Sequence, residues 1–125
     1  MLYLASPYSH PDPLMKEQRA LEAAKATAKL IYANVLTFSP IAHSHPMHLF
    51  GLDGDWKYWE KLDTWFIERC NAVVVLTIAG WDRSQGIAAE VRLAGKLGKS
   101  VWFWSGNAAD DPVFNFIVAT FKEKT

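Results

Sequence analysis

Short apolar runs alternate with longer amphipathic segments along the chain. Four apolar runs bounded by turn-forming residues predict strands at Leu2–Ala5, Val35–Phe38, Ala72–Thr77 and Ser100–Trp104. Apolar residues recurring every three or four positions predict helices at Pro13–Ala33, Asp55–Arg69, Gln85–Leu97 and about 111–122. In the first helix this stripe comprises Leu14, Leu21, Ala24, Ala28 and Ile31. Ile41–Gly54, rich in His, Pro and Gly, is expected to be a loop. The alternating order predicts a parallel α/β sheet with helices on both faces.

Composition narrows the class of protein. The 125 residues are expected to form one domain, 1–125. Thirteen basic and thirteen acidic residues balance, so nothing favours a nucleic-acid polymer as partner. No apolar stretch approaches the roughly twenty residues needed to span a membrane, and the first residues do not resemble a signal peptide. A single cysteine, Cys70, excludes a disulfide framework within the chain. We therefore expect a cytoplasmic protein.

Three segments should meet where the strands end. In open parallel sheets, ligands bind beyond the carboxyl ends of the strands. Ser6, Pro7 and Tyr8 follow the first strand, residues 39–48 follow the second, and residues 80–90 follow the third. Neither G-x-G-x-x-G nor G-x-x-x-x-G-K-[ST] occurs, which argues against a dinucleotide dehydrogenase or a P-loop enzyme.

Glu90 is the main catalytic candidate. Ser84 is placed to cap the helix that carries it, and Gly86, four residues earlier on the same face, has no side chain to cover the carboxylate. Such a carboxylate suits attack on an electrophilic carbon. The same pattern also fits an ordinary solvated helix glutamate.

The Asp55–Arg69 helix carries a second candidate and an unusually wide apolar surface. Asp55 can cap this helix. Asp63 lies within one apolar stripe and is either a structural hydrogen-bonded aspartate or a functional group. A second, adjoining stripe is also mostly apolar, and a helix of this kind needs two partners, the sheet and a neighbouring subunit. The first stripe contains Trp56, Trp59, Phe66 and Cys70, and the second contains Tyr58, Leu62 and Trp65.

His43, His45 and His48 form an H-x-H-x-x-H run in the expected loop. Zinc or iron accepts imidazoles at such spacing, and a substrate-contacting or merely polar loop is the alternative. Tyr8 is either an ordinary loop aromatic or, from its place just after the first strand, a residue that points into the cleft. Trp81 suits stacking on a flat base, or equally covers the core. Arg19 could reach a phosphate, although its helix position suggests solvent.

Several of these motifs resemble the nucleoside 2-deoxyribosyltransferase-like superfamily. The opening Leu2-Tyr3-Leu4-Ala5-Ser6-Pro7-Tyr8, an aspartate before the third strand, Ser84-x-Gly86-x-x-x-Glu90 and Gly98-Lys99 follow that pattern over residues 2 to 104. The Ser39-Pro40-Ile41-x-His43-x-His45 segment is similar to an uncharacterised bacterial branch of it.

The resemblance implies a three-layer α/β/α, flavodoxin-like (Rossmann-like) sheet of four to five strands. It implies that Glu90 attacks C1′ of a deoxyribosyl group, that Asp63 acts as acid/base or holds the base, and that Tyr8 positions Glu90. It also implies that Ser84 binds the sugar or a 5′ group, while Ser6, Pro7, His43, His45, Trp81 and Gly86 are further candidates for substrate binding.

Cleavage or transfer at the N-glycosidic bond of a (deoxy)nucleoside or nucleoside monophosphate is therefore expected, with no cofactor or metal. The expected assembly is a homodimer or homotetramer. Two alternatives remain: a non-catalytic nucleotide-binding module, and a metal-dependent hydrolase that uses His43, His45 and His48.

Overall fold

Parallel strands form the centre of the molecule. The computed structural model describes residues 1–52 and 56–124, apart from the side chain of residue 56. Within this part of the chain, four strands lie in the order β2-β1-β3-β4: β2 (Thr37–Phe38), β1 (Leu2–Ala5), β3 (Ala72–Leu76) and β4 (Ser100–Trp104). All three pairings are parallel. The chain thus moves to one side of β1 and then to the other, which places a topological switch point between β1 and β3.

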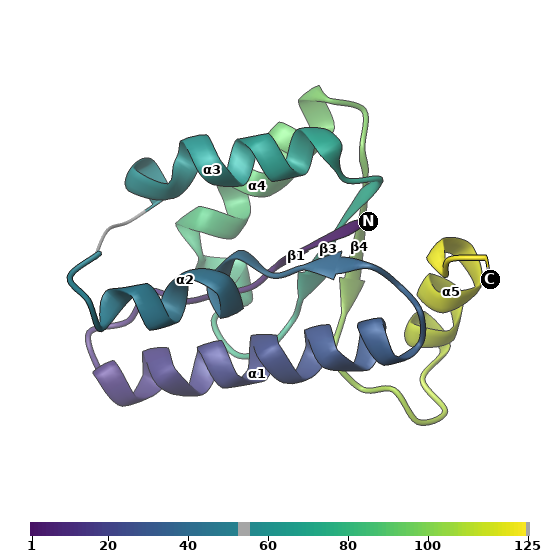
Figure 1. Ribbon diagram of the computed structural model, residues 1–125, viewed down its shortest axis with the longest axis horizontal. Coiled ribbons are helices and arrows are strands. Elements are labelled where there is room, and N and C mark those ends of the chain that lie inside the picture. Colours follow the sequence, from purple (N-terminus) through teal and green to yellow (C-terminus); the bar gives the residue numbers. More distant parts are fainter. Residues whose placement is uncertain (53–55, 125) are drawn as a thin grey trace.

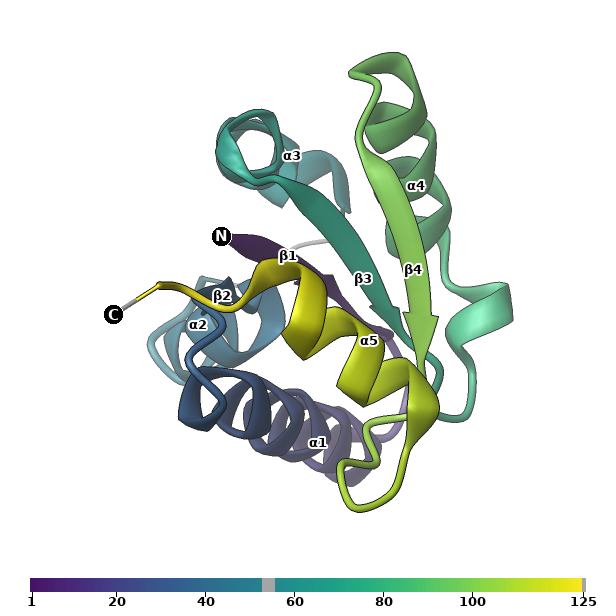
Figure 2. The ribbon, with the colours of Figure 1, turned by 90° about the vertical axis from the view of Figure 1, so that its right-hand side faces the viewer.

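Helices cover both faces of this sheet (Figures 1 and 2). One core lies between the sheet and the pair α1 (Pro13–Tyr32) and α5 (Pro112–Phe121). The other lies between the sheet and the pair α3 (Trp56–Arg69) and α4 (Gln85–Lys96). The three-layer α/β/α, flavodoxin-like architecture expected from the sequence is confirmed.

Strand alternation decides which residues of β1 reach which layer. Leu2 and Leu4 are fully buried in the core beneath α1 and α5. Tyr3 and Ala5 are fully buried on the opposite face, with the residues of α3 and α4. A tyrosine therefore lies in the middle of the sheet, directed towards the two helices that carry the candidate carboxylates.

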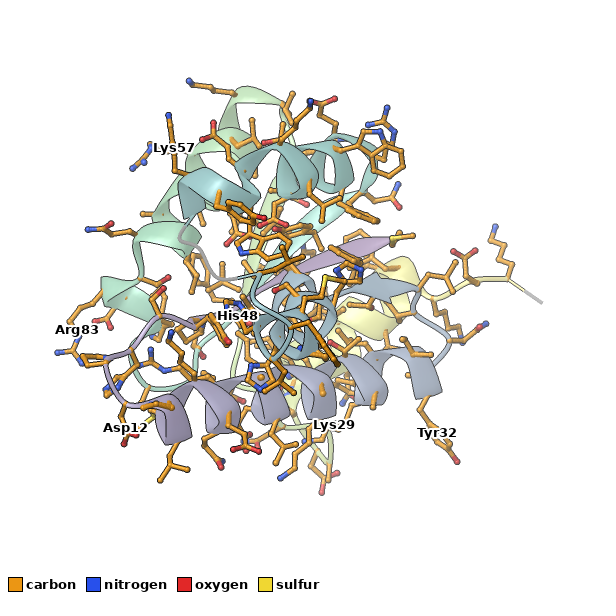
Figure 3. The ribbon with its side chains drawn as sticks, turned by 60° about the vertical axis from the view of Figure 1, so that its left-hand side comes forward. Asp12, Lys29, Tyr32, His48, Lys57 and Arg83 are labelled. Atoms are coloured by element: carbon orange, nitrogen blue, oxygen red, sulfur yellow. The ribbon has the colours of Figure 1, made fainter. Side chains whose placement is uncertain are left out.

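The apolar stripe predicted for α1 is wrong. Leu14 is 73% exposed, and the rest of the predicted stripe also faces solvent. Alanines dominate the face that packs on the sheet, because small side chains let the helix lie close to the strands. The buried residues are Ala20, Ala23, Ala26 and Leu30. Tyr32, at the end of the helix, points outward and is 95% exposed (Figure 3).

The loop expected at Ile41–Gly54 is wrong over its first part, which is helical, while residues 53 and 54 lie outside the described residues. Pro40–His48 forms a helix, α2, that begins with Pro40 after the N-cap Ser39, whose hydroxyl accepts a hydrogen bond from the Ala42 amide. Pro46 is tolerated inside this short helix. The histidine, proline and glycine content favoured a loop, although Ser39 followed by Pro40 is an ordinary signal for the start of a helix.

Smaller differences concern the ends of elements. β2 is shorter than the expected Val35–Phe38, because the Val35 amide closes the end of α1 by bonding to the Leu30 carbonyl. The proposed cap Asp55 lies outside the described residues. The expected capping of α4 is confirmed: Ser84 Oγ accepts a hydrogen bond from the Ile87 amide at 3.1 Å. A short 3₁₀ helix, η1 (Trp81–Arg83), precedes it. Among the described helices, none is long and apolar enough to span a bilayer.

The second apolar stripe of α3 faces outward. Tyr58, Leu62 and Trp65 are 55%, 37% and 49% exposed, whereas Phe66 stacks on Phe38 at the sheet with ring centroids 3.7 Å apart. Such a contiguous apolar surface is uncommon on a monomer. The Arg69 guanidinium lies 3.9 Å from the Trp65 ring and covers only part of it. This stripe is the surface on which a subunit contact is predicted.

Trp65→Glu should dissociate the assembly. The substitution places a charge in an apolar contact that a symmetric pairing would bury twice. Light scattering at micromolar concentration should give a dimer or larger for the parent protein and a monomer for the variant. Lys25→Glu, at an exposed position on α1 in the layer on the other side of the sheet, is the control and should leave the assembly intact. A monomeric parent protein would contradict the predicted interface.

Candidate functional site

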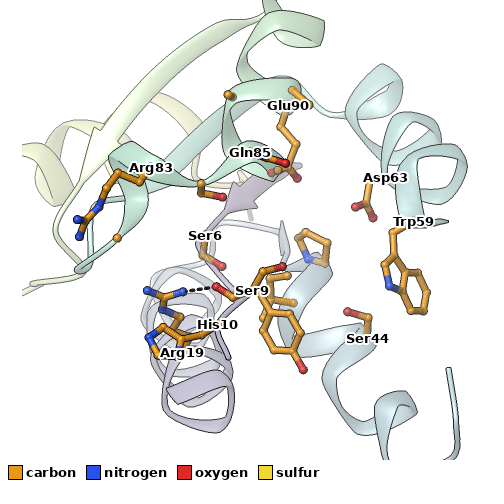
Figure 4. A pocket seen from close by; sticks show the side chains of 18 of the residues that line it. Ser6, Ser9, His10, Arg19, Ser44, Trp59, Asp63, Arg83, Gln85 and Glu90 are labelled. Atoms are coloured by element: carbon orange, nitrogen blue, oxygen red, sulfur yellow. Dashed lines mark hydrogen bonds between the residues drawn. The ribbon is translucent and has the colours of Figure 1, made fainter. Parts of the chain in front are cut away.

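A cavity of about 880 Å³ opens beyond the carboxyl ends of β1 and β3 (Figure 4). Its walls come from the loop after β1, from α2 and α3, and from the start of α4. This is the switch-point position expected for ligands of such sheets. Six predicted site residues line it, namely Ser6, Tyr8, Asp63, Ser84, Gly86 and Glu90.

Glu90 is buried rather than solvated. Only 4% of the residue is exposed, and the Tyr3 hydroxyl donates a hydrogen bond to Glu90 Oε2. Burial raises the pKa of Glu90 to about 8, and the hydrogen bond from Tyr3 opposes that rise. A Cβ added to Gly86 would meet only Ser84 Oγ, at 3.8 Å. The absence of a side chain at Gly86 therefore leaves the approach to the Glu90 carboxyl open on that side.

Asp63 reaches the same cavity from α3. It is 7% exposed, and burial raises its pKa to about 7, against a hydrogen bond with Tyr3 that acts in the opposite direction. The charge of Asp63 in turn raises the pKa of Glu90. Two buried carboxyls that influence each other in this way titrate as a pair. Near neutral pH the pair holds about one proton.

Tyr3 connects the two carboxyls. Burial, and then the charge of Glu90, hold the pKa of Tyr3 well above its ordinary value, so the hydroxyl keeps its proton. A phenol has one proton and can donate it to only one carboxylate at a time. Tyr3 donates it to Glu90, which favours the ionised form of that carboxyl, but burial raises the pKa of Glu90 above that of Asp63. The proton that the pair retains is therefore shared between the two carboxyls, and the form with ionised Glu90 and protonated Asp63 is one of its two arrangements.

The contact with Glu90 that the family resemblance implied for Tyr8 is made by Tyr3. The Tyr8 hydroxyl lies 2.7 Å from His45 Nδ1, and its ring centroid lies 5.1 Å from that of His48. The sequence does not identify Tyr3 as a site residue, because it lies within an apolar run that predicts a buried strand. A buried tyrosine hydroxyl needs a hydrogen-bond partner, and this requirement was the available signal.

Four predicted substrate-binding residues do not line the cavity: Pro7, His43, His45 and Trp81. The helical path of residues 40–48 turns the His43 ring onto Phe38, at 5.7 Å, and His45 towards Tyr8. Trp81 packs against the core beneath α4, with its ring 5.5 Å from Phe103. His45 does not line the cavity but contacts Tyr8, which does. His48 lines the cavity directly.

The cavity is also lined by residues to which the sequence assigned no site role. Trp59 and Ser44 face the cavity from α3 and α2, near Asp63 (Figure 4). Arg19, for which the sequence left both solvent and a phosphate open, reaches the cavity from α1, and Arg83 lines it from η1. Figure 3 places Arg83 at the edge of the molecule, and Figure 4 shows it on the opposite side of Glu90 from Asp63 and Trp59. Helix periodicity could not identify these residues, because each reaches the cavity through tertiary placement.

The histidine run does not assemble a metal site in the described part of the chain. Within residues 1–52 and 56–124, no three His, Cys, Asp or Glu side chains are grouped so as to hold a metal ion. His45 and His48 lie together, with ring centroids 6.4 Å apart, and they pack around Tyr8.

Comparison with known proteins gives a family and no activity. A family model described as "Domain of unknown function (DUF1937)" matches residues 1–106. The match covers the sheet and every element that lines the cavity. A search of curated proteins found no match to the chain.

Proposed function

The chain belongs to the DUF1937 family, and we propose that it cleaves or transfers the N-glycosidic bond of a (deoxy)nucleoside or nucleoside monophosphate. The observation that carries this proposal is the pair of buried carboxyls, Glu90 and Asp63, that lie in one cavity and meet at Tyr3. A glycosidase that forms a covalent intermediate uses two carboxyl groups, one ionised as the nucleophile and one protonated as the acid. The resemblance of the sequence to the deoxyribosyltransferase-like superfamily supports the same chemistry.

In the first step, ionised Glu90 attacks C1′ of the sugar. The bond between C1′ and the base nitrogen breaks, and its electron pair leaves with the base. Asp63 donates its proton to the departing base, so the base leaves neutral. The products of this step are a glycosyl ester on Glu90, the free base and an ionised Asp63.

In the second step, water or the nitrogen of a second base attacks C1′. Asp63 accepts the proton that this nucleophile loses, and the ester bond to Glu90 breaks. Glu90 and Asp63 thereby return to their starting protonation states. Water gives net hydrolysis, and an acceptor base gives transfer.

Tyr3 assists both steps without changing its own protonation. Its hydrogen bond fixes the carboxylate of Glu90 and favours the ionised form. Positive charge that develops at the sugar in the transition state is stabilised by this nearby anion. The Trp59 and His48 rings, with centroids 6.3 Å apart and planes tilted by 43°, both line the cavity and provide aromatic surface suited to contact with a base.

Glu90→Ala should abolish release of base. A mass-spectrometric screen of nucleosides and nucleoside monophosphates identifies the substrate of the parent protein, and the variant is then assayed on it. Losing a covalent nucleophile typically lowers the rate by several orders of magnitude. Glu17→Ala, at an exposed position on α1, is the control and should retain the parent rate. Undiminished turnover by a folded Glu90→Ala protein would contradict the mechanism. Ligand binding with no base released from any compound would favour a binding module.

The dependence of kcat/KM on pH should be bell-shaped, with limbs near pH 7 and pH 8. Below about 7 both carboxyls are protonated and Glu90 is not a nucleophile, and above about 8 both are ionised and the acid is lost. Asp63→Asn should lower kcat/KM by roughly a hundredfold and remove the alkaline limb. It should leave the acidic limb near its parent position, because in this scheme Asp63 carries no charge while Glu90 ionises on that limb.

Asp82→Asn serves as the matched control, since Asp82 is exposed on η1 and does not line the cavity. A melting temperature measured for each variant separates loss of the acid from loss of the fold. An Asp63→Asn protein with the parent profile and parent rate would assign Asp63 a structural role.

A further inference from the structure

Three buried polar side-chain atoms in the described part of the chain lack a hydrogen-bond partner. They are Ser6 Oγ, Arg19 Nε and Trp59 Nε1. All three residues line the one cavity that holds Glu90 and Asp63. Buried donors are normally satisfied, and each of these atoms can donate a hydrogen bond. Their shared location indicates a ligand that brings acceptor atoms to more than one part of the cavity.

Arg19 is held in place through its outer nitrogens. Nη1 donates to the Ser9 carbonyl at 2.8 Å, and Nη2 donates to the Ala79 carbonyl at 3.4 Å. Gly80 makes room for this contact: its φ is +94°, and a Cβ there would lie 2.4 Å from Arg19 Nη2. Both partners of the guanidinium are neutral, so they orient its charge without compensating it. Among the described residues, no carboxylate pairs with Arg19.

Further donors gather at the same end of the cavity. Ser84 Oγ accepts the capping bond from Ile87, which leaves its hydroxyl proton to donate. The first turn of α4 lines the cavity beside it, and helix N-termini favour anions. Arg83 adds a second guanidinium to the lining. Figure 4 draws Arg19, Arg83 and Ser6 on one side of Glu90.

The other side of Glu90 has different chemistry. There, Figure 4 shows Asp63, Trp59 and Ser44. An acid, an indole N–H and a hydroxyl can each bond to the nitrogen and oxygen atoms of a base. The reacting carboxyl therefore separates a cationic end of the cavity from an end suited to a base.

We propose that the substrate is a nucleoside 5′-monophosphate, whose phosphate binds at Arg19, Ser6 and Arg83. This inference rests on the proposed function, because it assumes that C1′ of the sugar faces Glu90. In a nucleotide the base and the 5′ phosphate lie on opposite ends of the sugar, which matches the two ends of the cavity. A phosphate supplies several acceptor oxygens and a negative charge, as the unpaired Arg19 Nε and Ser6 Oγ require. A nucleoside without phosphate supplies no anion to these atoms.

Binding can be measured without turnover. Calorimetry with 2-deoxyribose 5-phosphate, and with 2-deoxyribose for comparison, reports the phosphate contribution alone. The phosphorylated sugar should bind at least tenfold more tightly, and its affinity should fall as salt rises. Arg19→Gln and Ser6→Ala should each weaken its binding roughly tenfold or more. Lys25→Gln removes an exposed charge from the same helix as Arg19 and should change the affinity less than twofold.

Turnover supplies the second measurement. For one base, kcat/KM with the 5′-monophosphate should exceed that with the nucleoside, and Arg19→Gln should reduce this ratio. Ser6→Ala removes a single oxygen atom and tests the same subsite if Arg19→Gln fails to fold.

The outcomes separate this inference from the function it rests on. Equal binding of the two sugars, or a phosphate affinity that Arg19→Gln and Ser6→Ala leave unchanged, would overturn the phosphate subsite. Release of base from nucleosides with no preference for the monophosphate would keep the function and contradict the inference. Phosphate binding that depends on Arg19, with no base released from any nucleotide, would keep the subsite and contradict glycosidic cleavage.

Discussion

The hydrogen bond from Tyr3 to Glu90 is the interaction on which the site depends. It joins the central strand of the sheet to α4, across 87 residues of sequence. Tyr3 is fully buried, so its hydroxyl has no access to bulk solvent and must be satisfied by the protein. Because β1 lies between β2 and β3, with helices on both faces, the ring is fixed by the whole sheet. The carboxyl of Glu90 is thereby held to an inner strand of the sheet.

Burial of the two carboxyls has an energetic consequence for the fold. Desolvation raises the pKa of both Glu90 and Asp63, so the folded state binds their protons more tightly than the unfolded chain does. Their contribution to stability is therefore fully present below their ordinary pKa values of 3.8 and 4.5 and is lost progressively as the pH rises from there through about 7 to 8. If the two carboxyls served only the stability of the fold, apolar side chains at these positions would stabilise it as well or better. Retention of two such groups in one open cavity is what functional sites typically display.

The sequence predicted those parts of the site that depend on local rules. Ser84 is recognisable as a helix cap, Gly86 as a gap beside Glu90, and Asp63 as an acid within an aromatic stripe. Alternation of strands and helices is also a local pattern, and it led to the parallel sheet and to the edge where the cavity lies. Each of these inferences needs only the period of an element and the residues at its ends.

Residues whose role is set by tertiary packing escaped the same reasoning. Arg19 lies on an exposed-looking helix position, yet it is drawn to the cavity by the carbonyls of Ser9 and Ala79, which come from two distant loops. Tyr3 is hidden within an apolar run until its strand is placed opposite α3 and α4. The stripe of α1 failed for a related reason: alanines were outweighed by leucines in a hydrophobicity pattern, although close packing on the sheet favours the smaller residues.

The protonation of the carboxyl pair can be measured directly. Carbon-13 NMR of protein labelled at the side-chain carboxyls of Asp and Glu, with Glu90→Gln and Asp63→Asn to assign the signals, follows each group through a pH titration. Both resonances should move between about pH 6 and 9, with one proton retained by the pair near pH 7.5. If both groups instead titrate below pH 5, as exposed carboxyls do, the pair does not share a proton at neutral pH and the proposed division of acid and nucleophile is contradicted.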